Sequence, residues 1–284
     1  MAIAFVEPVL LQRGGGLRLR RLSVLDRVGL AGIAAMTLLA LAVPWVAPHD
    51  PTTQVASPFL SLGHGGLLGT DDLGRDLFSR VLYGMRTSWF SALAVVMVSV
   101  AVGGAIGLLA GVKGGKTDAV LMRLTDLALA LPGPVLAIAV IMAIGPGLTH
   151  VLLAVLVVWW PYYARVVRGE ARALVVRPHV DAARVIGLGT TRLARRHVLP
   201  GVLPVVLVAA SVDLGALVLT LAGLSFIGLG TPPPAPELGA MSSGGLVYLF
   251  GHPTIPLAPA AAVAALAFFA NLAGDGLRNL LEDV

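Results

Sequence analysis

The chain contains 284 residues, of which 57% are hydrophobic and 12% are charged. A soluble domain carries about 25% charged residues, so this composition excludes an ordinary soluble protein and predicts an integral membrane protein. The chain has no cysteine, which excludes disulfides and thiolate metal sites.

Six apolar stretches predict membrane-crossing helices, because a hydrocarbon core about 30 Å thick needs roughly 20 apolar residues per crossing. These stretches lie at residues 28–46, 88–112, 124–144, 148–167, 203–229 and 255–273. Pro132 and Pro134 in the third stretch and Pro161 in the fourth predict bends. The glycines between residues 103 and 107 predict close helix packing. The sequence therefore predicts an all-α protein with six transmembrane helices.

The basic residues predict the orientation of these helices. With six crossings, the two termini and residues 113–123 and 165–196 lie on one side, which holds 17 of the 20 lysines and arginines. Lys and Arg are retained on the cytoplasmic side during insertion, so both termini are predicted to be cytoplasmic. The same distribution accounts for the pI of 10.2, so nucleic-acid binding is not predicted.

This topology divides the chain into consecutive parts. They are a cytoplasmic N-terminal segment (1–27), a first transmembrane helix (28–46), an extracytoplasmic loop (47–87), a core of five transmembrane helices (88–275) containing the cytoplasmic loop 165–200, and a cytoplasmic tail (276–284). The stretch GVKGGKTD at residues 111–118 lacks the spacing of a phosphate-binding loop. ATP binding by this chain is therefore not predicted.

Residues 178–201 form the longest polar interruption in the second half of the chain, and they coincide with most of the predicted cytoplasmic loop 165–200. Pro178 is predicted to end an extension of the fourth helix, since proline removes a hydrogen-bond donor and clashes with the preceding turn. A short helix is then predicted from about Asp181, whose carboxylate favours the positive end of a helix. A second short helix is predicted over residues 192–198.

Glycines and alanines give this loop its expected shape. Gly187 and Gly189 suit a left-handed turn between the two short helices. Ala182 and Ala183 are expected to present a close-packing surface. Such a knob outside the membrane suits insertion into a cleft of another protein.

The same loop resembles the cytoplasmic loop of permease subunits of ATP-binding-cassette (ABC) importers. The signature of that family is Glu-Ala-Ala, three residues and Gly, followed at a fixed distance by Leu-Pro. The matching residues are Asp181, Ala182, Ala183, Gly187, Leu199 and Pro200. Asp181 stands where the family usually has Glu. The ending RHVLP, which contains His197, is similar to the dipeptide, oligopeptide and nickel branch of the family.

Three further segments resemble the C-type subunits of that branch, and they occur in the same order. They are LGTDDLGRDLFSRVLYGMRTS (68–88), LSFIGLGTPPP (224–234) and NLAGDGLRN (271–279). The resemblance runs from about His49 to the C-terminus. The family often has a Glu at the position of Leu221. Because this chain lacks that acid, the resemblance is a weaker guide to its substrate preference.

The resemblance implies a type I ABC importer permease fold, with cytoplasmic coupling helices between the fourth and fifth transmembrane helices. It implies a transport subunit of a bacterial inner membrane rather than an enzyme, with no cofactor in the chain. The implied partners are a second homologous permease subunit, two ATPase subunits that hold ATP and Mg, and an extracytoplasmic substrate-binding protein. The implied cargo is a di- or oligopeptide or a related molecule, moved by alternating access.

The predicted outer loop carries a charged cluster, GTDDLGRD. Its members are Asp71, Asp72, Gly74, Arg75 and Asp76. The glycine allows a tight turn. Several carboxylates close together make a metal site conceivable, but the arginine among them can pair with them instead, and no metal site is predicted. A cap that touches a binding protein and a self-contained ion-paired turn are both compatible with the pattern.

Polar residues inside the predicted crossings are candidates for the translocation pathway, because a carboxylate in a crossing helix usually faces an aqueous path or a partner. The candidates are Asp126, Asp213 and Ser225, and Asp213 is the best placed. A helix-to-helix hydrogen bond would also explain Asp213. An alternative function is a secondary transporter driven by an ion gradient, with Asp126 and Asp213 as its titrating groups.

Overall fold

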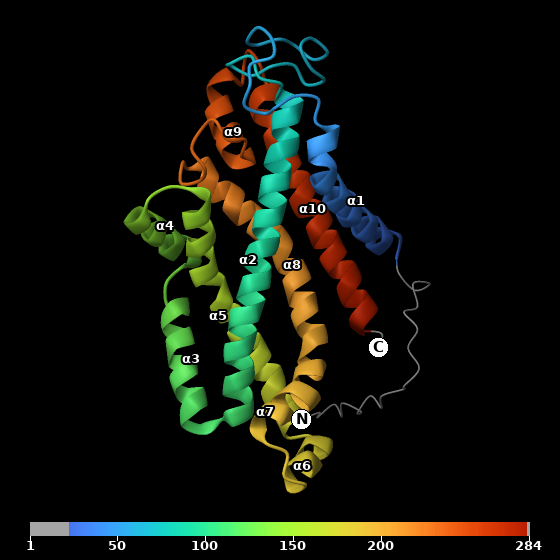
Figure 1. Ribbon diagram of the computed structural model, residues 1–284, viewed down its shortest axis with the longest axis vertical. Helices are drawn as coiled ribbons and strands as arrows, with labels where there is room; N and C mark the ends of the chain where they lie inside the picture. Colours follow the sequence, from blue (N-terminus) through green and yellow to red (C-terminus); the bar gives the residue numbers. More distant parts are fainter. Residues whose placement is uncertain (1–22, 283–284) are drawn as a thin grey trace, which may run out of the picture.

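The computed structural model describes residues 23–282, whose helices run along one long axis (Figure 1). The helices are α1 (Val24–Val46), α2 (Leu77–Lys113), α3 (Gly115–Leu129), α4 (Gly133–Ile144), α5 (Leu148–Val175), α6 (Pro178–Val185), α7 (Thr190–Leu193), α8 (Leu199–Phe226), α9 (Leu238–Gly245) and α10 (Thr254–Glu282). The predicted N-terminal segment lies outside the described residues up to position 22.

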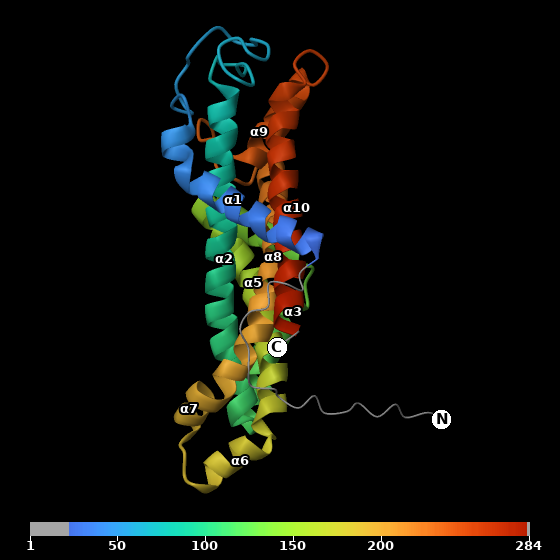
Figure 2. The same cartoon turned by 90° about the vertical axis from the view of Figure 1, so that its right-hand side faces the viewer.

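Different segments of the chain lie at the two ends of the molecule. The loop between α1 and α2 lies at one end of the long axis, whereas α6 and α7 lie at the other (Figures 1 and 2). The long helices α2, α5, α8 and α10 run along this axis, and α5 and α8 lead to the end that carries α6 and α7. Their largest shared group of buried apolar side chains includes Trp89, Val155, Leu217 and Leu266.

Within the described residues, five helical segments are long and apolar enough to cross a membrane. They contain α1, α2, α5, α8 and α10. A sixth span results when α3 and α4 are counted together, although the two are bent by 84°. The bend predicted from Pro132 and Pro134 in the third crossing is therefore confirmed, and it divides the crossing into two helices. Pro132 and Pro134 stand at the start of α4, and proline disfavours helical geometry at the residue before it, so the helix breaks there.

Other boundaries also differ from the predicted ones. The second helix begins at Leu77, because the Asp76 side chain caps it by accepting a hydrogen bond from Ser79 N at 3.0 Å. The predicted loop 47–87 therefore ends at residue 76. Residues 276–282 of the predicted tail belong to α10. The fourth helix continues to Val175 before Pro178, as predicted, and passes through Pro161 without interruption.

α2 and α5 pack closely along much of their length. Gly103 and Gly107 lie on the face of α2 that meets α5. A Cβ atom at Gly107 would lie 2.4 Å from the carbonyl oxygen of Ala164. The predicted close packing is confirmed at these two glycines, whereas Gly104 faces away, since its Cβ would have no neighbour nearer than 4.0 Å.

α10 packs between α1 and α8 through the segment NLAGDGLRN. Asn271 lies against Gly215 of α8, where a Cβ would come within 2.6 Å of the asparagine side chain. Asn279 Nδ2 donates to Asp26 Oδ1 at 3.1 Å, which ties the end of α10 to the start of α1. These contacts give the segment a packing role in this chain.

Candidate functional sites

The knob formed by residues 176–200 is built on a buried apolar base. Val180 and Ala183 of α6 and Leu193 of α7 are buried together with Val198 and Leu174. This base fixes the two short helices to the end of α5. The knob is therefore a rigid extension of a long helix rather than a loose loop.

Gly187 makes the turn between the two short helices. Its φ of +85° lies in the left-handed region, which favours glycine. Gly187 N donates to Arg184 O at 2.9 Å, and Leu188 N donates to Ala183 O at 3.1 Å. This pair of hydrogen bonds is the Schellman ending of a helix. Gly189, with a φ of −66°, precedes α7 instead and makes no left-handed turn.

Two large apolar side chains protrude from the knob among exposed charged ones. Ala182 is exposed, but Ala183 is buried in the base, so the two alanines do not form one surface. The side chains that protrude are Val185, which is 87% exposed, and Ile186, which is 77% exposed. Asp181 is also exposed and pairs with Arg184 at 3.3 Å. Exposed apolar patches of this kind mark interaction sites.

The second half of the knob runs directly into α8. It starts at Thr190 rather than at residue 192, and a π-helical turn over Ala194–Val198 joins α7 to α8. His197 and Leu199 are half-buried in this connection and Pro200 is exposed. The backbone is therefore helical without interruption from the knob into α8.

Ion pairs join the same region of α5 to α3. Arg168 pairs with Asp118 through both its Nε and its terminal nitrogen, and Arg172 lies 3.3 Å from the same carboxylate. Asp126 pairs with Arg165 at 2.7 Å, and both side chains are about half exposed. Sequence analysis missed Asp118. The available signal for an acidic partner was the spacing of Arg165, Arg168 and Arg172, which places them along one face of α5.

Asp213 lies on α8 among aromatic side chains of α5. The Tyr163 hydroxyl and the Trp159 indole lie near its carboxylate. Asp213 lines two cavities, one between α4, α5 and α8 and one between α5, α8 and α10. Asp126 lines neither of them. The structure thus separates the two aspartates that sequence analysis had grouped as candidates.

Ser225 is buried at the end of α8, where it contacts the turn that follows. A Cβ atom at Gly230 would lie 2.1 Å from its hydroxyl oxygen. Glu237, which sequence analysis missed, is also buried, and it caps α9 by accepting from Gly239 N at 3.3 Å and Ala240 N at 2.9 Å. Burial raises the pKa of the Glu237 carboxyl, while the backbone donors and the nearby Ser225 oppose that rise.

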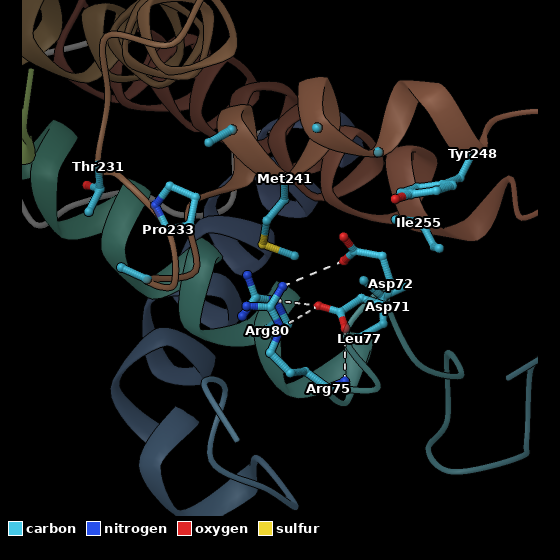
Figure 3. Close-up of a pocket in the computed structure, with 14 residues that line it drawn as sticks. Asp71, Asp72, Arg75, Leu77, Arg80, Thr231, Pro233, Met241, Tyr248 and Ile255 are labelled. Carbon is cyan, nitrogen blue, oxygen red and sulfur yellow. Dashed lines mark hydrogen bonds and ion pairs between the residues drawn. The ribbon is translucent and has the colours of Figure 1, made fainter. Parts of the chain in front are cut away.

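The charged cluster of the outer loop is held together by internal ion pairs (Figure 3). Asp71 Oδ2 lies 2.7 Å from Arg75 Nε and 3.3 Å from Arg80 Nε. Asp72 lies 3.7 Å from Arg75 and is more exposed. Gly74 makes the predicted tight turn with a φ of +74°. Asp76 is the cap of α2 described above.

Arg80 connects this cluster to a distant loop. Its terminal nitrogen donates to the carbonyl oxygens of Pro51 at 2.6 Å and Pro234 at 3.2 Å. A cavity of about 160 Å³ lies between the cluster and α9, where Thr231, Met241 and Tyr248 line it (Figure 3). No group of three or more His, Asp or Glu side chains within residues 23–282 is arranged to hold a metal ion.

Residues 103–283 match the family model described as the inner membrane component of binding-protein-dependent transport systems. That range contains the knob, its connection to α8 and Asp213. The chain belongs to this family. It is a transport permease.

Curated relatives agree with this family. The permease is 39% identical to the probable D,D-dipeptide transport system permease protein of Escherichia coli K12. The aligned region of 251 residues covers 88% of this chain and 84% of that protein. It is 36% identical to the dipeptide transport system permease protein of Haemophilus influenzae, over 90% and 89% of the two chains. It is also 36% identical to the nickel transport system permease protein of Escherichia coli K12, over 90% and 93%.

Solved structures show the same fold. The permease superposes on a subunit of the inward-facing MetNI methionine ABC transporter with a TM-score of 0.56 at 20% identity, over 72% of this chain and 97% of that one. It superposes on an amino acid ABC transporter solved with histidines with a TM-score of 0.55 at 19% identity, over 72% and 94%. The predicted type I ABC importer permease fold is confirmed, and the comparisons support an importer rather than an ion-gradient carrier.

Proposed function

We propose that this permease is one of two homologous subunits that together form the pathway of a peptide importer. Two ATPase subunits, which bind ATP and Mg, drive it from the cytoplasm, and an extracytoplasmic binding protein delivers the cargo. The relatives named for dipeptides support a peptide cargo. The distribution of basic residues supports cytoplasmic termini in the inner membrane.

The knob is the proposed docking element for an ATPase subunit. The observation that carries this proposal is the pair of protruding side chains, Val185 and Ile186, on a base that is itself fully packed. A rigid apolar tip fits a hydrophobic groove and buries its surface there. Asp181, Ala182, Gly187, His197, Leu199 and Pro200 then position or flank that tip.

The helices connect this tip to the pathway. α5 runs without a break from the cavities at Asp213 to the knob, and α8 returns from the knob to the same cavities. Asp118 holds α3 to α5 through Arg168. ATP-driven closure of the ATPase subunits therefore moves α5, α8 and α3 together, and this movement exposes the pathway first to one side of the membrane and then to the other.

A single exposed side chain tests the docking element. We expect Ile186→Asp to lose co-purification of the ATPase subunits from native membranes, because it places a charge in the centre of an apolar contact. Val247→Asp is the matched control, since Val247 is 79% exposed near α9, toward the opposite end of the molecule. Retention of the ATPase subunits by Ile186→Asp would contradict the docking role.

Uptake into liposomes tests the cargo and the energy source. The complete transporter, with its binding protein outside and ATP trapped inside, is expected to accumulate a radiolabelled dipeptide. Liposomes without ATP are the control. Accumulation without ATP that is abolished by a protonophore or a sodium ionophore would instead establish the ion-gradient carrier.

A further inference from the structure

The two cavities at Asp213 offer a ligand one carboxylate and several aromatic rings. The first, of about 290 Å³, is lined by Trp159, Tyr162 and Asp213 together with apolar side chains of α4 and α5. The second, of about 460 Å³, is lined by Tyr162, Asp213 and Arg278 together with Val205 and other apolar residues of α5 and α8. Tyr162 and Asp213 belong to both, so they stand where the two cavities adjoin.

The polar atoms at this position are not satisfied by the protein. Asp213 Oδ2 and the Tyr163 hydroxyl oxygen are both buried, and neither has a hydrogen-bond partner within the described part of the chain. Tyr163 is fully buried. The polar groups nearest to the carboxylate are the Tyr163 hydroxyl and the Trp159 indole, and the carboxylate keeps further acceptor capacity toward the cavities that it lines.

Comparison with the other helical carboxylates indicates what kind of partner is missing. Asp118 is paired with two arginines and Asp126 with one. Asp213 forms no ion pair with any described residue, and its neighbours are the aromatic side chains of Trp159, Tyr162 and Tyr163. A carboxylate bordered by the faces or edges of aromatic rings is complementary to a cation, which gains from both the charge and the rings.

The chemistry of this site selects an organic ammonium group. A bare metal ion needs several oxygen or nitrogen ligands, and within residues 23–282 no group of three such side chains is present. An ammonium group carries three donors, which suit one carboxylate and the tyrosine hydroxyl oxygen. The first cavity has no described Lys or Arg in its lining, and its apolar walls would accommodate a small side chain beside the ammonium group.

We propose that Asp213, with Trp159 and Tyr162, binds the protonated amino group of the transported peptide. This inference rests on the proposed function, since it takes a peptide as the cargo. The site would hold the peptide during its passage, independently of the selection made by the binding protein.

Equilibrium binding to the assembled transporter, without its binding protein, tests the site. Radiolabelled dialanine is the probe, and unlabelled dialanine and N-acetyl-dialanine are the competitors. In the wild-type transporter, dialanine is expected to compete at least about tenfold better than its acetylated form, because acetylation removes the charge. The measured quantity is the ratio of the apparent affinities of dialanine and N-acetyl-dialanine. In Asp213→Asn this ratio is expected to fall toward one, and in Asp213→Glu it is expected to be largely restored.

Asp275→Asn, in an exposed carboxylate of α10, is the matched control and is expected to keep the wild-type ratio. If Asp213→Asn fails to assemble, Trp159→Leu serves instead and is expected to lower the ratio about threefold. A ratio that is unchanged in Asp213→Asn overturns the inference. Loss of assembly in both Asp213→Asn and Asp213→Glu, with an unchanged ratio in Trp159→Leu, also overturns it and assigns Asp213 to a subunit contact.

The outcomes for the site and for the proposed function are distinct. Uptake of dialanine by the complete wild-type transporter, combined with an unchanged ratio in Asp213→Asn, leaves the peptide importer standing and removes the site. Absence of dialanine and other dipeptide uptake in the wild type overturns the peptide cargo, and the inference falls with it.

Discussion

Asp71 and Asp72 are adjacent in the sequence, but the structure gives them different roles. Asp71 is buried, accepts hydrogen bonds from Leu73 N and Arg75 N at 2.9 Å each, and pairs with two guanidinium groups. Asp72 is 37% exposed at its side chain and makes one long ion pair. Burial makes the first pair costly to break, whereas solvent screens the second.

We therefore expect Asp71→Ala to lower the free energy of unfolding by about 3–5 kcal/mol, because it leaves buried Arg80 without its ion pair and buried Arg75 with only the long pair to Asp72. Thermal unfolding in detergent measures the change as a fall in Tm. Asp72→Ala is the neighbouring control and is expected to change the free energy by about 1 kcal/mol or less. Equal effects of the two substitutions would show that the buried pairs do not hold the outer loop.

Close backbone approach at glycines helps to hold the helices of this permease together. Because lipid tails are as apolar as leucine, burial of apolar surface drives helix association weakly in a bilayer, and tight contact between small residues takes over. α2 and α5 illustrate this at Gly103 and Gly107. Their contact holds α2 against the part of α5 that runs from Trp160 to Arg168.

Gly107→Val is expected to disrupt this contact, because its side chain would overlap the backbone of α5 at Ala164. Overpacking of this kind typically costs about 1–3 kcal/mol. Size-exclusion chromatography of the fluorescently tagged protein should show less of the monodisperse peak and a lower Tm. Gly104→Val, three residues away on an open face, should resemble the wild type, and an equal loss in both variants would argue against the interface.

At the scale of the whole molecule, the two candidate functional surfaces lie at opposite ends of the long axis (Figures 1 and 2). One end carries the ion-paired loop and α9, and the other carries the knob. α5 and α8 connect them and share the cavities at Asp213. This arrangement suits a subunit that receives cargo at one end and mechanical input at the other.

The absence of native cysteine allows the orientation to be tested with single thiols. Val176 is 73% exposed beside the knob and Val247 is 79% exposed near α9. With a membrane-impermeant maleimide, Val247→Cys is expected to react in intact spheroplasts, whereas Val176→Cys is expected to react only after lysis. The reverse pattern would invert the topology inferred from the basic residues.

The sequence by itself determined the features that depend on local physics. Low charge predicted a membrane protein, and the apolar stretches predicted its crossings, because bilayer thickness sets their length. Gly187 predicted the left-handed turn of the knob, since few other residues adopt that geometry. The two prolines correctly marked a bend in the third crossing, although its size, 84°, was not predictable from them.

Only the tertiary structure decided which helix face meets which. The hydrophobic pattern of α8 carries little of this information, because both lipid and neighbouring helices are apolar and either can cover any face. The pairing of Asp126 with Arg165, the placement of Asp213 at two cavities and the contact of Arg80 with Pro234 join residues that are distant in the chain. Such contacts depend on how the helices pack, and packing in a bilayer is set by the fit of whole surfaces.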